Sequence, residues 1–108
     1  MLLAAAAREA ESALDLFFVT LAPEARVPAM RLAGALRAEG VSCDLDFGGR
    51  GAKGQFKQAD RSGARYAAIL GEDELSRGTI KVRDMASGEE REIDVSGGPA
   101  ELLRAMGA

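Results

Sequence analysis

The chain has 108 residues, of which 47% are hydrophobic and 29% charged, and its formal net charge at pH 7 is −3. This size and composition predict one globular domain, and no apolar run approaches the roughly 20 residues of a membrane-spanning helix. The chain contains no histidine, the commonest general base and zinc ligand, and its single cysteine excludes an internal disulfide. We therefore expect no catalytic residue, no metal site and no membrane association. Because the first residues lack the basic segment of a secretory signal, we expect a cytoplasmic protein.

Hydrophobic periodicity and chain breakers predict the following elements. Residues 1–14 are alanine-rich and are interpreted as a connector helix that precedes a domain at 15–108. Strands are predicted at 15–21, 41–47 and 65–70, with helices from Pro23 to Gly40 and over 52–62 between them. An acidic turn at 71–78, a hairpin of 79–85 with 90–95, and a helix at 99–106 complete the chain. In the first helix the apolar positions Met30, Ala33 and Leu36 recur at helical spacing.

This order of elements is βαβαβ, then ββ, then α. It predicts an α/β fold with a mixed five-stranded sheet and flanking helices. The first three strands are expected to be parallel, because a helix connects each to the next. The last two are expected to extend the sheet as an antiparallel hairpin.

Positive charge gathers in one stretch of an otherwise acidic chain. Residues 47–65 carry five basic side chains and one acidic side chain. Lys53, Lys57 and Arg61 follow one another at intervals of four, so a helix would place them on one face. Such a face is either a solvated helix surface or a site for an anion. The sequence alone leaves both open.

Glycines in the same stretch match the spacing of a dinucleotide-binding loop, Gly49-x-Gly51-x-x-Gly54. That interpretation is weak, because the glycines follow the second predicted strand rather than the first. Only one more parallel strand is predicted after them, so half of a nucleotide-binding sheet would be missing.

A nucleic-acid surface is the stronger hypothesis for an anion site. Arg50, Lys53 and Lys57 could contact phosphates, and Phe47 could stack on an unpaired base. Glu74, in the acidic turn, and Arg83, in the hairpin, could read base edges. Each residue also has a local alternative. Phe47 could be core, Glu74 could make a local salt bridge, and Arg83 could pair with Asp84 or Glu92 across the hairpin.

The motifs resemble those of a known family, the C-terminal anticodon-binding domain of bacterial histidyl-tRNA synthetases. The matching pieces include F-F-V-T-L-A-P-E-A and Q-F-K-Q-A-D-R-S-G-A-R-Y-A-A-I-L-G-E-D-E-L, and they run in the family's order from about residue 16 to 94. Gly51 and Gly54 depart from the family's usual serine and lysine. A glycine inside a helix costs about 1 kcal/mol relative to alanine, so the helix could begin later than residue 52.

The resemblance implies the mixed sheet described above and recognition of the anticodon stem-loop of histidine tRNA. By similarity to the related threonyl and prolyl enzymes, Glu74, Arg83 and Lys57 are the expected base and phosphate contacts. The catalytic domain, with its ATP and Mg²⁺, would lie upstream of this chain, which needs no cofactor itself. The resemblance also implies that the full-length protein is a homodimer. The alternative is a synthetase-like module for protein interaction, dimerisation or regulation.

Overall fold

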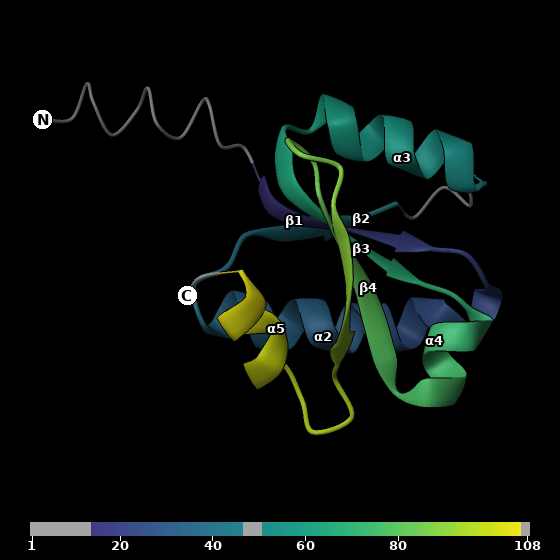
Figure 1. Cartoon of the computed structure of the whole chain (residues 1–108), viewed down its shortest axis with the longest axis vertical. Coiled ribbons are helices and arrows are strands. Elements are labelled where there is room, and N and C mark those ends of the chain that lie inside the picture. The colour runs from purple at the N-terminus through teal and green to yellow at the C-terminus, as the bar shows by residue number, and fades with distance from the viewer. Residues whose placement is uncertain (1–13, 47–50, 107–108) are drawn as a thin grey trace, which may run out of the picture.

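The computed structural model describes residues 14–46 and 51–106, which form a sheet with helices on both faces (Figure 1). The strands are β1 (Leu14–Thr20), β2 (Cys43–Leu45), β3 (Ala64–Leu70), β4 (Thr79–Asp84) and β5 (Glu90–Asp94). The helices are a 3₁₀ turn η1 (Pro23–Ala25), α2 (Arg26–Ala38), α3 (Ala52–Arg61), α4 (Glu72–Arg77) and α5 (Ala100–Ala105). Among these residues, no helix is long and apolar enough to span a membrane.

The sheet has the strand order β2-β1-β3-β4-β5. β1 pairs in parallel with both β2 and β3, whereas β4 is antiparallel to β3 and β5. The predicted mixed five-stranded sheet is therefore confirmed. The chain runs from β1 through α2 to β2 on one side of β1, and then through α3 to β3 on the other side of β1. As a result, α2 and α3 lie on opposite faces of the sheet (Figure 1).

Each face of the sheet has its own apolar core. Ala29, Ala33 and Leu36 of α2 and Leu102 of α5 pack with Leu16 and other residues on one face. On the other face α3 contributes Ala59 to a smaller core with Phe17, Val19, Ala67 and Ile69. Both faces of β1 and β3 are thus buried in their central parts, which explains the apolar runs at 16–19 and 67–70.

The acidic segment at 71–78 is a helix rather than the turn that the sequence predicted. The three acidic residues fall in the first turn of α4, where they complement the helix dipole. The Glu74 Oε1 atom accepts a hydrogen bond of 2.8 Å from the Gly71 N–H, which caps the helix. Gly78 ends the helix with a φ of +68°, a conformation that favours glycine.

Three smaller expectations need correction. The second strand is only three residues long, because its pairing with β1 ends at Leu45. Met30 is 46% exposed, and the buried stripe of α2 is Ala29, Ala33 and Leu36. Finally, α3 begins at Ala52 and contains Gly54, so this glycine does not delay the helix. The expected connector lies outside the described residues except for Leu14, which belongs to β1.

Candidate nucleic-acid interface

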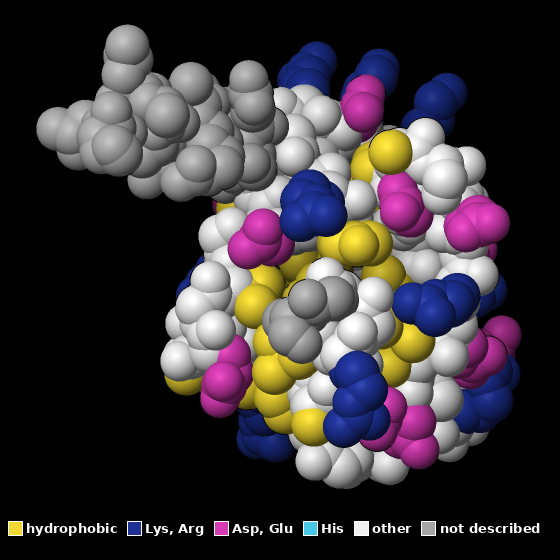
Figure 2. All heavy atoms as spheres, turned by 60° about the vertical axis from the view of Figure 1, so that its left-hand side comes forward, with side chains coloured by type: hydrophobic (Ala, Val, Ile, Leu, Met, Phe, Trp, Pro, Cys, Tyr) yellow, Lys and Arg dark blue, Asp and Glu magenta, His cyan; other side chains and the backbone are white. Residues whose placement is uncertain are grey.

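The outward side of α3 is a basic surface. Lys53, Lys57 and Arg61 are all exposed there, while Gln55 and Ala59 are buried against the sheet. We call these three side chains the basic face. Figure 2 shows dark blue side chains projecting from the top of the molecule, where α3 lies in Figure 1. The predicted alignment of the three cations on one side of the helix is therefore confirmed.

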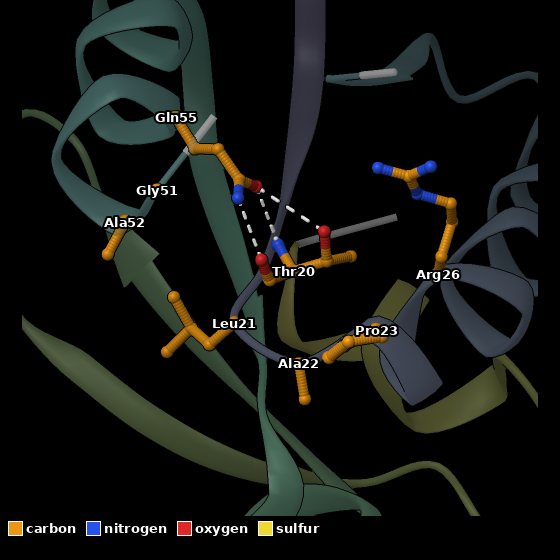
Figure 3. Close-up of a pocket in the computed structure, with 8 residues that line it drawn as sticks. All are labelled: Thr20, Leu21, Ala22, Pro23, Arg26, Gly51, Ala52 and Gln55. Atoms are coloured by element: carbon orange, nitrogen blue, oxygen red, sulfur yellow. Dashed lines mark hydrogen bonds between the residues drawn. The ribbon is translucent and has the colours of Figure 1, made fainter. Parts of the chain in front are cut away.

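A pocket of about 610 Å³ opens beside the N-terminus of α3, at the carboxyl end of β1. Gly51, Ala52 and Gln55 line one side, and Pro23 and Arg26 line the other (Figure 3). Among the residues that the structure describes, no side chain caps the N-terminus of α3. Backbone N–H groups at an uncapped helix start favour an anion, and Arg26 adds positive charge across the pocket. The carboxyl ends of parallel strands are also where ligands commonly bind in α/β sheets.

Arg83 lies on the same side of the sheet as α3. Its guanidinium is 4.6 Å from the centre of the Phe56 ring of α3. Its Nη2 and Nε atoms lie 2.6 Å and 2.8 Å from Glu90 Oε2 on the neighbouring strand. The expected partners Asp84 and Glu92 were therefore wrong, because Glu90 is directly opposite Arg83 in the register.

The two rejected partners are engaged elsewhere. Asp84 Oδ1 accepts hydrogen bonds from the N–H groups of Ala86 and Ser87 in the hairpin turn. Glu92 Oε2 accepts hydrogen bonds from Arg77 Nε at 2.7 Å and Thr79 Oγ1 at 2.5 Å. These two hydrogen bonds hold the pKa of Glu92 below its ordinary value, and the one from Thr79 has the larger effect.

Glu74 lies apart from Arg83. It is buried at 7% exposure, caps α4, and sits 3.9 Å from Arg77. Arg83 pairs with Ala67, four positions before Gly71, so the two sites are separated by about 13 Å at roughly 3.3 Å per residue along β3. The structure therefore brings Arg83 near α3 but leaves Glu74 at the end of the sheet. Phe47 and Arg50 lie outside the described residues.

Gln55 and Arg26 are pocket residues that the sequence interpretation missed. Gln55 is 4% exposed, and its carboxamide bonds the backbone of Thr20. The available signal was its spacing: Gln55 precedes the buried Ala59 by four residues, so both point to the sheet. Arg26 had no comparable signal, because only the fold brings it opposite α3.

Other chemistry finds little support in the described ranges. They hold no cluster of three or more acidic or cysteine side chains that could bind a metal ion. Cys43 is buried, and this burial raises the pKa of its thiol to about 11, with a smaller opposing effect of Arg37. Its thiolate, the reactive form, is therefore scarce at neutral pH.

Comparison with known proteins assigns the chain to a family. Residues 15–104 match the family described as the anticodon binding domain. The chain is 69% identical over 106 residues to a histidine--tRNA ligase of Rubrobacter xylanophilus, covering 98% of this chain and 24% of that protein. It is 49% identical over 79 residues to a histidine--tRNA ligase of Nocardia farcinica, covering 73% of this chain and 19% of that protein.

Solved structures give the same result. A crystal structure of apo histidyl-tRNA synthetase from S. aureus superposes with a TM-score of 0.79 at 37% identity, covering 91% of this chain and 24% of that one. The histidyl-tRNA synthetase of Nostoc sp. PCC 7120 gives 0.75 at 26% identity, covering 87% of this chain and 21% of that one.

The chain therefore belongs to the anticodon-binding domain family. Within that family it is an anticodon-binding domain of the kind found in histidine--tRNA ligases, which are aminoacyl-tRNA synthetases. It spans about a fifth to a quarter of the length of the relatives compared, so it corresponds to only one part of such an enzyme.

Proposed function

We propose that this domain recognises the anticodon stem-loop of histidine tRNA and thereby supports aminoacylation by a catalytic domain of the same protein. The observation that carries the proposal is the placement of the basic face and Arg83 on one side of the sheet. Lysines on α3 suit the RNA backbone, whose phosphates give affinity without sequence preference. The arginine suits the edge of an unpaired base.

Arg83 is suited to this task because its donors are only partly used. A guanidinium has five N–H donors, and Glu90 engages Nε and Nη2 through one oxygen. The Nη1 nitrogen is left for a base edge. Stacking on Phe56 and pairing with Glu90 hold the guanidinium plane before RNA arrives, which lowers the entropy cost of binding.

Titration of the 108-residue chain with an anticodon stem-loop of histidine tRNA tests the proposal. The matched control is the same stem-loop with a changed anticodon. We expect tighter binding of the histidine stem-loop and an affinity that falls with salt, with a slope of about −0.7 to −0.9 for each phosphate contact. Absence of binding at low salt, or equal affinity for both RNAs, would contradict it.

A protein-interaction module is the second candidate function. It is favoured by Val27 and Met30 on α2 and by Leu21 after β1, which are 56%, 46% and 47% exposed. Sedimentation measurements on the chain, with and without RNA, separate the two candidates. A stable self-association that RNA does not affect would favour the interaction module.

The proposal extends to the whole protein. The whole protein would be a cytoplasmic homodimer. Its catalytic domain would bind ATP and Mg²⁺, while the anticodon-binding domain would take no cofactor. The relatives compared support the presence of a catalytic domain elsewhere in the protein, because they are histidine--tRNA ligases several times longer than this chain. Thermal unfolding of the 108-residue chain with and without ATP is the corresponding test. A rise in the midpoint with ATP would assign nucleotide binding to this domain.

A further inference from the structure

We infer that Gln55 is a positioning residue for RNA binding. Its carboxamide pairs with the Thr20 backbone in the place that a neighbouring strand would take, and so fixes the first turns of α3, which present the basic face. The inference rests on the proposed function, in which the lysines of α3 contact RNA. It adds a residue that touches no RNA in this role but determines where the lysines lie.

The need for such a residue follows from the length of β2. β2 pairs with β1 at only three positions, the last being Phe18 with Leu45, although β1 continues to Thr20. The Leu21 N–H bonds to Leu70 O on β3, at 3.0 Å. Because successive N–H groups of a strand point to opposite sides, the Thr20 backbone faces the side of β2, two residues beyond the last described pair of β1 and β2. Buried backbone groups there require another partner.

Gln55 supplies that partner from the helix. The Thr20 N–H donates to Gln55 Oε1 at 2.7 Å, and Gln55 Nε2 donates to the Thr20 carbonyl oxygen at 2.7 Å. A carboxamide carries one acceptor and two donors, so it can substitute for the peptide group of a neighbouring strand. Figure 3 shows this paired contact at the back of the pocket, between α3 and the end of β1. The side chain is only 4% exposed, so water competes little for these bonds.

The contact also sets the direction of the basic face. Lys53 and Lys57 stand two residues before and after Gln55, and residues two apart point about 200° from each other on a helix. When Gln55 points into the sheet, both lysines must point outward, as their exposure shows. Among the described residues no side chain caps the N-terminus of α3, and Gly54 weakens its first turn, so the contact of Gln55 with β1 is important for holding this end of the helix.

Paired substitutions separate positioning from general effects. Gln55→Met keeps the length of the side chain but removes its hydrogen bonds to Thr20, and Gln58→Met makes the same replacement at a half-buried site on the same helix. We expect Gln55→Met to speed hydrogen exchange of the Thr20 amide. It should also weaken binding of the histidine anticodon stem-loop about tenfold relative to Gln58→Met and flatten the salt slope by about 0.7–0.9 per lost phosphate contact.

A second pair provides a pH readout that a purely structural role would not produce. Gln55→Glu retains the acceptor for the Thr20 N–H but donates to the Thr20 carbonyl only when protonated. Gln58→Glu adds the same negative charge without touching Thr20. We expect Gln55→Glu to bind RNA more weakly than Gln58→Glu at neutral pH, and we expect the gap to close as the pH falls through the pKa of the carboxyl group introduced at position 55. This pair also decides the matter if Gln55→Met does not fold.

The outcomes distinguish this inference from the proposed function. If the unsubstituted chain does not bind the stem-loop, the proposed function fails, whatever the variants do. If that chain binds but Gln55→Met binds with the affinity and salt slope of Gln58→Met, only the positioning role is overturned. A gap between Gln55→Glu and Gln58→Glu that does not change with pH overturns it equally.

Discussion

The guanidinium of Arg83 lies 4.6 Å from the centre of the Phe56 ring. This contact joins α3, which carries the basic face, to the β4–β5 hairpin. Arg83 also pairs with Glu90 at 2.6 Å. A cation stacked on a ring and held by a carboxylate has little rotational freedom. This places a preorganised donor next to a cationic helix, the combination that base recognition on a phosphate backbone requires.

Arg83→Ala should weaken binding of the histidine anticodon stem-loop by about 1–3 kcal/mol and relax the preference for its anticodon. The reason is that a base edge would lose its donor.

Lys57→Ala should weaken binding of the histidine stem-loop and of the changed-anticodon control to a similar extent. It should also lower the salt slope by about 1, because it removes a phosphate contact. Isothermal titration at several salt concentrations measures both effects.

The control for Arg83→Ala is Glu90→Gln. It removes the ion pair but keeps the guanidinium, so the anticodon preference should persist. Equal losses for both RNAs with Arg83→Ala would remove the base-reading role from Arg83.

Glu74→Ala should lower the free energy of unfolding by about 1–3 kcal/mol, because the buried Gly71 N–H would lose its acceptor. Glu74→Gln keeps an acceptor oxygen and should lose much less. Urea unfolding measures both changes. Equal destabilisation by the two substitutions would show that the negative charge of Glu74, rather than the hydrogen bond, stabilises α4.

Much of the fold was predictable because its signals are local. The apolar runs of β1 and β3 and the alternation in β4 identify strands whatever surrounds them. The basic face followed from spacing alone. By contrast, α4 is a six-residue helix that depends on the cap from Glu74, and its acidic sequence resembled a turn.

The site was harder to predict because it depends on tertiary contacts. Gln55 acquires its role because β1 continues to Thr20, two residues past its last described pair with β2, and nothing in the sequence near Gln55 records that. The pairing of Arg83 with Glu90 required the register of the hairpin, which the predicted strand bounds left open by a residue or two.

Cys43 should react slowly with a disulfide reagent in the folded protein. Its side chain is buried, and the raised pKa of about 11 leaves little thiolate at about pH 8, against an ordinary pKa of about 8.5. We expect the rate to rise with urea in parallel with unfolding. Rapid reaction of the folded chain, at the rate of a small thiol, would contradict the buried position.

Glu92 should make stability depend on acid pH. Hydrogen bonds from Thr79 and Arg77 lower the pKa of Glu92 in the folded state, so its contribution is present above the unfolded value of about 4.3 and is lost as the pH falls through the lower folded value. The difference in unfolding free energy between the unsubstituted chain and Glu92→Gln should therefore shrink as the pH falls below about 4.3. Glu72→Gln, on the exposed side of α4, controls for the general loss of a negative charge. The hydrogen bonds from Thr79 and Arg77 are specific to Glu92. The same pH dependence for both variants would therefore show that these hydrogen bonds do not favour the ionised form of the Glu92 carboxyl group over the neutral form.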